Sequence, residues 1–133
     1  MTDIRKVGAL WIREKRLFVV KKKGLEPLIT LGGKIEPDES EVECLLREVW
    51  EEIRMRIRAY THFGSFYGPT VDGKQMIHQS CYLVDIAGEP VVNPKDSVEG
   101  FEWIDRDYAR KGVKLVPQLE KQIIPELVER GYV

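Results

Sequence analysis

Five charged side chains lie close together in this 133-residue chain, at a spacing that can support metal chemistry. They are Glu39, Arg47, Glu48, Glu51 and Glu52. At about 100° per residue, the last three glutamates fall within an arc of about 100° on one face of a helix. Like charges three and four residues apart destabilise a helix by roughly 0.2–0.5 kcal/mol per pair, so a counter-ion is expected. Clustered carboxylates favour Mg²⁺, with Mn²⁺ as an alternative, because both ions prefer oxygen ligands.

A solvated acidic helix face is the alternative interpretation of the same residues. Arg47 lies at the edge of the patch, four residues before Glu51, where its guanidinium can hold a carboxylate in place. The preceding loop, with Gly32-Gly33 and Glu39, can add backbone carbonyls and another carboxylate. Composition alone leaves both interpretations open.

From Gly33 to Met55 the chain resembles the Nudix box, the signature of the Nudix hydrolases (MutT-like enzymes). That pattern is G-x5-E-x7-R-E-U-x-E-E-x-G-U, where U is aliphatic, and it covers 23 of the 133 residues here. Within it the chain departs only at Arg54, where the family has glycine. Leu31 and Asp38 also stand where family members often have proline and glycine. All three differences fall at backbone-shaping positions and leave every charged residue of the box in place.

The resemblance implies an α/β fold, specifically an α/β/α sandwich with a mixed central sheet. It also implies a Mg²⁺-dependent enzyme that hydrolyses the pyrophosphate of a nucleoside diphosphate linked to a further group. A metal ion would neutralise the dense phosphate charge that repels an attacking water. By this resemblance Glu48, Glu51 and Glu52 are metal ligands, and Gly33 offers its carbonyl.

The resemblance leaves the identity of the general base open. Glu48 and Glu52 are the candidates inside the box, and Arg47 would orient both of them. Glu99 is the candidate outside the box, in a segment expected to be a loop, four residues before Trp103. A solvated loop carboxylate is the alternative interpretation of Glu99.

Three further residues are weaker candidates for substrate binding. Lys21 begins a run of three lysines at a strand end and can meet phosphates, although such runs more often protect an edge. Phe66 and Tyr67 can stack on a base or ribose, although strand aromatics more often pack in a core.

A helix must carry the acidic cluster. Ser40 is a suitable N-cap, and Glu43 completes a capping box. The apolar residues that follow repeat with helical spacing and predict a helix of about four turns. They are Val42, Leu45, Leu46, Val49, Trp50 and Ile53. Trp11, Trp50 and Trp103 are expected in the core.

Strands are expected on both sides of this helix, because short β-branched and aromatic runs alternate with Gly- and Pro-rich turns. A closing helix is expected at Leu119–Arg130, ended by Gly131 and kinked or split by Pro125. The expected strands are 7–12, 17–20, 28–31, 57–67, 76–86 and 101–104.

Composition predicts one soluble cytoplasmic domain over residues 1–133. The apolar share is 43%, the charged share 32% and the net charge −1, so no overall field recruits nucleic acid or a membrane surface. Cys44 and Cys81 have neither metal-ligand nor disulfide-framework spacing. A small-molecule nucleotide is the expected partner, and a homodimer is possible, because relatives often dimerise.

Among substrates, a nucleoside triphosphate is the leading expectation, because the short chain lacks the extra N-terminal domain often seen in ADP-ribose hydrolases. ADP-ribose and dinucleoside polyphosphates are the alternatives. A non-catalytic nucleotide-sensing module is a further alternative, although the intact acidic cluster favours an enzyme.

Overall fold

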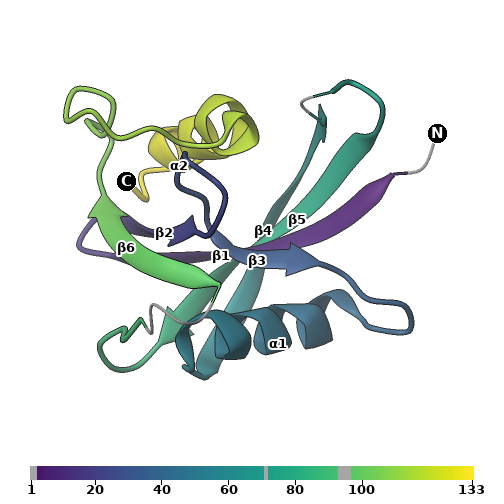
Figure 1. Cartoon of the computed structure of the whole chain (residues 1–133). Helices are drawn as coiled ribbons and strands as arrows, with labels where there is room; N and C mark the ends of the chain where they lie inside the picture. Colours follow the sequence, from purple (N-terminus) through teal and green to yellow (C-terminus); the bar gives the residue numbers. More distant parts are fainter. Residues whose placement is uncertain (1–2, 71, 93–96) are drawn as a thin grey trace.

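The computed structural model describes residues 3–70, 72–92 and 97–133. Over these ranges the chain forms a six-stranded sheet with helices on both faces, the α/β/α arrangement expected from the sequence (Figure 1). The elements are β1 (Ile4–Arg13), β2 (Arg16–Lys22), β3 (Leu31–Lys34), α1 (Glu41–Ile53), β4 (Ile57–Pro69), β5 (Met76–Ile86), β6 (Val98–Ile104), η1 (Leu119–Ile123) and α2 (Ile124–Glu129).

Strand β1 organises the sheet, which is mixed. It runs parallel to β5 on one side and antiparallel to β3 and β2 on the other. The order is β4-β5-β1-β2-β6, with β3 added to β1 outside this path. Because β3 pairs with residues 6–9 of β1 and β2 pairs with residues 12 and 13, β3 and β2 lie on the same side of β1. This topology brings Lys22 of β2 near the glycine pair of β3.

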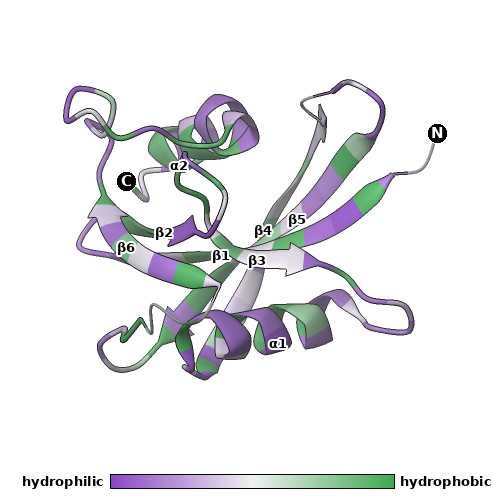
Figure 2. Ribbon diagram, in the orientation of Figure 1, coloured by the Kyte–Doolittle hydropathy of each residue, from purple (hydrophilic) through white to green (hydrophobic). Residues whose placement is uncertain are grey.

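The two faces of the sheet bury separate hydrophobic clusters. Alternating residues of β1 divide between them: Val7, Ala9 and Trp11 pack on the side of α1, and Leu10 packs on the side of η1 and α2. Figure 2 shows hydrophobic positions along the strands and hydrophilic residues along the outer side of α1. The alternation follows from the two-residue period of a strand, so each face has its own helical cover.

Helix α1 begins as the sequence predicts. The Ser40 hydroxyl accepts from the Glu43 amide at 3.0 Å, and the Glu43 carboxylate accepts from the Ser40 amide at 3.0 Å, forming the capping box. The helix ends at Arg54, whose φ of 55° lies in the left-handed region and whose amide donates to the Trp50 carbonyl at 2.9 Å. Arg54 thus adopts the backbone conformation that glycine favours in the family motif.

The expected burial of Trp50 is wrong. Its side chain is 40% exposed, whereas Trp11 is buried and Trp103 is half-buried. The predicted apolar stripe is wider than the surface that α1 covers, so Leu46, at 43% exposed, and Trp50 lie at its open margin.

The C-terminal helical segment is split, as Pro125 predicts. A π-helical turn, η1, leads directly into α2, and Pro125 occupies the first turn of α2, where its missing amide costs no helical hydrogen bond. Within the described residues, no helix is long and apolar enough to cross a bilayer.

Several predicted strand boundaries are wrong, and two of them bear on the site. The strand expected at 28–31 begins only at Leu31, because Leu28 and Ile29 form isolated bridges. Strand β6 begins at Val98, so Glu99 lies in a strand and not in the expected loop. Residues 71 and 93–96, in the two expected loops, lie outside the described residues.

Candidate metal and phosphate site

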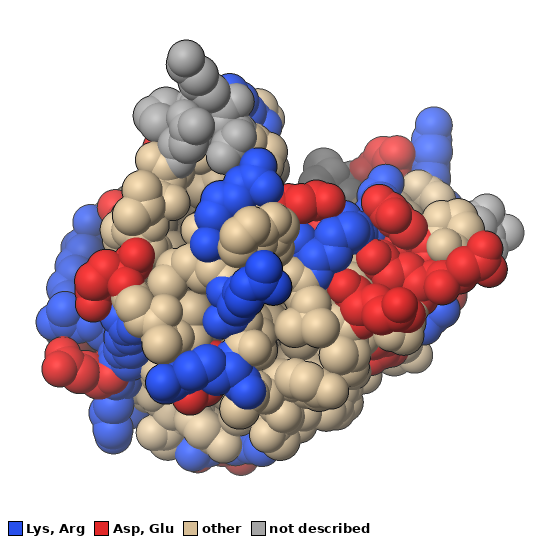
Figure 3. Space-filling view, turned by 90° about the horizontal axis from the view of Figure 1, so that it is seen from below, with Lys and Arg blue, Asp and Glu red and all other residues tan. Residues whose placement is uncertain are grey.

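The charged residues of the motif meet beside β3. Arg47 connects them: its Nε donates to Glu39 at 2.6 Å, and its terminal nitrogens donate to Glu39 and Glu48 at 3.0 Å and to Glu51 at 3.3 Å. Figure 3 shows a cluster of acidic side chains on this face of the molecule, with basic side chains among them. Arg47 therefore contacts Glu48 as expected, whereas its expected contact with Glu52 is not among these hydrogen bonds.

Glu39 anchors Arg47. The Arg47 guanidinium, together with the Glu36 amide at 3.0 Å, lowers the pKa of Glu39 to about 2 from its usual 4.5. The same bonds raise the pKa of Arg47. A two-point contact between guanidinium and carboxylate fixes orientation as well as charge. Glu39 is therefore ionised at neutral pH and holds Arg47 in place, where Arg47 reaches Glu48 and Glu51.

Glu52 is buried, with only 4% of its surface exposed, and it is held from two sides. The Gly32 amide donates to one oxygen at 2.7 Å, and the Lys22 ammonium contacts the other at 2.7 Å. Lys22 also donates to the Gly32 carbonyl at 2.9 Å. Burial raises the pKa of Glu52, and Lys22 partly offsets that effect.

Both glycines of β3 stand at points of close approach, Gly32 to the backbone of β1 and Gly33 to the side chain of Glu48. At Gly32, where φ is 133°, an added Cβ would lie 2.0 Å from the Val7 carbonyl oxygen. At Gly33 an added Cβ would lie 2.7 Å from the Glu48 carboxylate. Only glycine fits at position 32 against β1, whereas a Cβ at position 33 would displace the Glu48 carboxylate. The glycine pair therefore brings the backbone of β3 against the acidic face.

Glu48 lies one helical turn before Glu52. Its side chain is 16% exposed, and burial raises the pKa of its carboxyl, while Arg47 acts in the opposite direction. The charge of Glu51 also raises the pKa of Glu48, and the charge of Glu48 raises the pKa of Glu52. A half-buried carboxylate with a raised pKa has the properties of a general base.

Sequence reasoning missed Lys6. It pairs with Lys34 across β1 and β3, and burial, followed by the charges of Lys22 and Lys34, lowers its pKa. Glu52 and Glu48 act on it in the opposite direction, so Lys6 lies within their field. No local pattern marks Lys6 in the sequence; its partners come from strand pairing. Basic side chains therefore border the acidic face.

The site residues suit a hard divalent cation. Within the described part of the chain, no three acidic, histidine or cysteine side chains form a ready-made metal cluster. Instead, the Lys22 ammonium lies between the Glu52 carboxylate and the Gly32 carbonyl, two oxygen donors that also suit Mg²⁺. The Gly33 carbonyl is turned toward the Cys44 thiol at 3.8 Å. The Lys22 ammonium thus occupies a position between two oxygen atoms of the type that a divalent cation prefers.

Glu99, the candidate base outside the box, lies on β6, the strand that pairs with β2. Lys21 pairs with Gly100 and Lys22 with Val98, so Glu99 occupies a bulge opposite the two lysines. Bulges re-aim side chains and are frequent next to active sites. The structure thus brings Glu99 onto the strand next to Lys22, which itself contacts Glu52.

The three weak substrate candidates lie elsewhere. Lys21 donates to the backbone carbonyls of Lys22, at 2.9 Å, and Leu25. Phe66 packs against the cluster beneath η1 and α2. Tyr67 is 55% exposed and stacks on His78, with ring centroids 4.4 Å apart. Of the lysine run, Lys22 and not Lys21 reaches the acidic face.

The NUDIX domain family model matches residues 3–127. The chain is 35% identical over 74 residues to the NAD-capped RNA hydrolase NudC of Pseudomonas entomophila, and 32% identical over 76 residues to that of Pseudomonas fluorescens. These matches cover 56% and 57% of this chain but only 25% and 26% of the relatives.

Solved structures match nearly the whole chain. The E. coli ORF135 protein is 25% identical with a TM-score of 0.73, covering 96% of this chain and 88% of that one. A MutT NUDIX hydrolase from Burkholderia pseudomallei is 20% identical with a TM-score of 0.75, and the match covers 98% of this chain and 99% of that one. The NUDIX domain of Shewanella oneidensis NrtR, complexed with ADP ribose, is 16% identical with a TM-score of 0.77. That match covers 98% of this chain and 89% of the other.

The fold, the acidic helix behind its glycine pair and the family match agree. The chain belongs to the NUDIX family. The resemblance drawn from the sequence is confirmed, and so is the sandwich fold.

Proposed function

We propose that this chain is a single-domain Nudix pyrophosphohydrolase that uses Mg²⁺ to split the pyrophosphate of a nucleoside triphosphate. One observation carries the proposal: buried Glu52 and half-buried Glu48 lie one turn apart, each held by a cation. Burial of two carboxylates is costly unless charge compensates it. Family membership and the hydrolase names of several relatives support the activity.

Each residue has a role in this proposal. Glu48, Glu51 and Glu52 would hold Mg²⁺, with a glycine carbonyl of β3 beside them. Bound there, Mg²⁺ would neutralise phosphate charge and favour attack by water. Arg47 holds Glu48 in position, and Lys6 and Lys22 add positive charge for the substrate phosphates. A general base must accept the proton of the attacking water.

Two glutamates compete for the role of base. Glu48 has a raised pKa that suits proton transfer, and Glu99 lies at the bulge next to Lys22. We assign the role to Glu48, because its geometry is fixed by Arg47 and by the close approach of Gly33. If Glu99→Gln abolishes the rise of kcat with pH and Glu48→Gln keeps it, that assignment fails.

A panel assay tests the activity. The whole chain is incubated with Mg²⁺ and each of a set of nucleoside triphosphates, ADP-ribose, diadenosine polyphosphates and nucleotide sugars. Glu52→Gln should lower kcat by roughly 10²–10⁴-fold, because it removes a buried charged ligand. Glu102→Gln, an exposed glutamate of β6, is the matched control and should leave kcat unchanged. No turnover of any substrate would overturn the proposed activity and favour a non-catalytic module, and equal turnover by Glu52→Gln would overturn the role assigned to Glu52.

A second candidate substrate is a pyrophosphate that joins a nucleoside to a second sugar, as in a dinucleotide or ADP-ribose. It is favoured by the relatives named as NAD-capped RNA hydrolases and by the neighbour complexed with ADP ribose. The products separate the two candidates, because a triphosphate yields a monophosphate and pyrophosphate, whereas a dinucleotide yields two monophosphates. The larger kcat/KM identifies the preferred class.

A further inference from the structure

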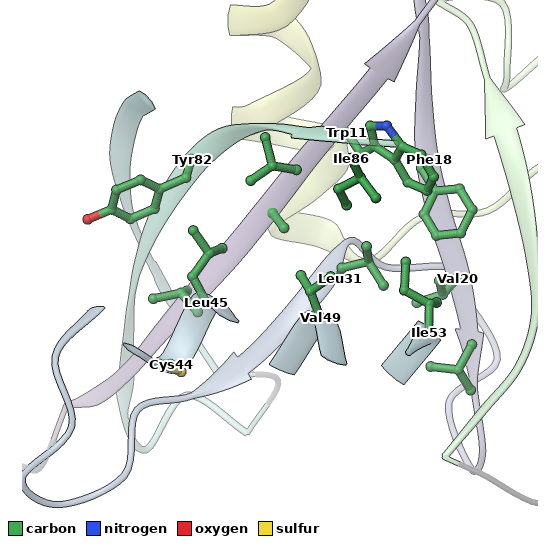
Figure 4. Packing of buried hydrophobic residues seen from close by; sticks show 14 residues of the cluster. Trp11, Phe18, Val20, Leu31, Cys44, Leu45, Val49, Ile53, Tyr82 and Ile86 are labelled. Atoms are coloured by element: carbon green, nitrogen blue, oxygen red, sulfur yellow. The ribbon is translucent and has the colours of Figure 1, made fainter. Parts of the chain in front are cut away.

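An apolar strip is left uncovered on the flank of α1. Cys44, Leu45 and Val49 point from the helix into the core (Figure 4). Leu46 and Trp50, one turn apart on the neighbouring flank, remain 43% and 40% exposed. Large exposed apolar side chains that lie together mark interaction surfaces.

Opposite charges border the two ends of this strip. Exposed Glu43 lies one turn before Leu46. At the other end Arg54 and Arg56 lie over the Trp50 ring, with their guanidinium carbons 5.9 and 4.8 Å from its centroid. On the same underside of the molecule, Figure 3 shows an acidic region and separate basic side chains with uncharged surface beside them. The apolar strip is therefore bordered by an acidic side chain at one end and by basic side chains at the other.

We propose that this flank of α1 binds a second copy of the chain, with the two α1 helices packed antiparallel about a twofold axis. A twofold interface must be self-complementary, with each residue meeting a different residue of the partner copy. With the axis near the middle of Leu46 and Trp50, Glu43 lies about 8 Å to one side and Arg54 about 9 Å to the other, at about 1.5 Å per residue. Glu43 of each copy then meets Arg54 of the other, and Leu46 meets Trp50.

The charge pattern favours a second copy over a polyanion. A nucleic acid would be attracted by Arg54 and Arg56 but repelled by Glu43 and the acidic loop before it. The next arginine along β4, Arg58, is already paired with Asp85 at 2.9 Å. The exposed strip uses both signs of charge at matched distances, which only a partner with the reverse pattern can satisfy.

Two other features agree with this interface. Arg54 keeps a left-handed conformation that costs a non-glycine residue roughly 1–2 kcal/mol, and a contact of its side chain with the second copy would offset that cost. The acidic face stays open, because Glu48 and Glu52 lie about 160° around the helix axis from Trp50 and Glu51 lies about 100° from it. The interface goes beyond the proposed hydrolysis and does not depend on it.

Sedimentation equilibrium of the purified full chain tests this interface. The wild type should form a dimer whose dissociation constant rises about tenfold or more in Trp50→Ala and in Arg54→Glu, since central aromatic and arginine anchors dominate interfaces. Adding Glu43→Arg to Arg54→Glu exchanges the charges and should restore association. Glu43→Gln keeps a side chain that can complete the capping box, and should weaken the dimer only through the lost charge.

The controls separate association from folding. Arg110→Glu, an exposed arginine beyond β6, should leave the dissociation constant unchanged, and circular dichroism should show every variant folded. A wild type that stays monomeric at high micromolar concentration overturns the proposal. A dimer insensitive to both Trp50→Ala and Arg54→Glu overturns it too. A monomer that binds a labelled single-stranded oligonucleotide through Arg54 assigns the surface to nucleic acid instead.

Discussion

At the scale of single residues, the contact between Glu52 and Lys22 couples stability to metal binding. The Lys22 ammonium partly compensates a carboxylate with 4% of its surface exposed. In metal-free protein, Lys22→Ala should therefore lower the free energy of unfolding by about 2–4 kcal/mol. Urea titration with EDTA measures this loss.

Magnesium should reverse much of that loss. Without the competing ammonium, Glu52 is free to accept Mg²⁺, so added Mg²⁺ should raise the Tm of Lys22→Ala more than that of the wild type. Lys111→Ala is the matched control, because it removes an exposed ion pair with Asp105 and should cost less than about 1 kcal/mol. An equal Mg²⁺ response in wild type and Lys22→Ala contradicts the prediction.

Glu39 should set the acid limit of stability. Its pKa is lowered to about 2 in the folded chain, against its usual value of 4.5 in an unfolded chain. A lowered folded pKa contributes stability that is fully present above the unfolded pKa and is lost as pH falls toward 2. Glu39→Gln should therefore be less stable than wild type at pH 7, and the difference should shrink as pH falls from about 5 to about 2.5.

Urea unfolding across that pH range, in EDTA, measures the effect. Glu48 and Glu52 have raised pKa values and so act with the opposite sign, gaining stability as they are protonated. Because both are present in wild type and variant, the difference between the two curves isolates Glu39. A constant difference at all pH values would mean that the Arg47 contact contributes nothing through ionisation.

At the scale of elements, α1 shows what local sequence can predict. Ser40 and Glu43 predicted its start, and Gly131 and Pro125 predicted the end and the break of the C-terminal segment. These signals depend on neighbours within four residues. The burial of Trp50 failed, because periodicity gives the direction of an apolar stripe but not the width of the surface that covers it.

The departure from the motif at Arg54 gives a direct prediction. Its φ of 55° is a conformation that glycine adopts freely, so Arg54→Gly should stabilise the monomer by about 0.5–1 kcal/mol, after the greater flexibility of unfolded glycine is subtracted. Asp38, the other residue that stands where family members often have glycine, has a φ of 66° and adopts the same left-handed conformation.

Urea unfolding of Arg54→Gly below the dimer dissociation constant measures this gain. Arg56→Gly is the matched control: it also removes a guanidinium from the Trp50 ring, but Arg56 is not among the residues with positive φ. It should therefore be neutral or destabilising. A destabilised Arg54→Gly would mean that the side chain contributes more to the monomer than its backbone costs.

At the scale of the whole molecule, the site depends on pairing between distant segments. The motif predicted Arg47 and the glutamates, but Lys6 and Lys22 reach them only because β1 holds β3 and β2 on one side. The bulge that displaces Glu99 likewise arises from pairing between β2 and β6. No local pattern encodes these contacts, since strand order is a property of the assembled sheet.

The two faces of the sheet should separate stability from catalysis. Leu127 of α2 and Leu45 of α1 are both fully buried, in the two different clusters. Leu127→Ala and Leu45→Ala should each cost about 2–5 kcal/mol through lost contacts and a cavity. Leu45→Ala should also lower kcat, because α1 carries Glu48 and Glu52, whereas Leu127→Ala should leave kcat per folded molecule near that of wild type.

Urea unfolding and steady-state assays at low temperature measure both effects. Exposed Leu46→Ala is the control for loss of a leucine on α1. Equal loss of kcat in the two buried variants would mean that the whole sheet, and not α1 alone, positions the acidic face.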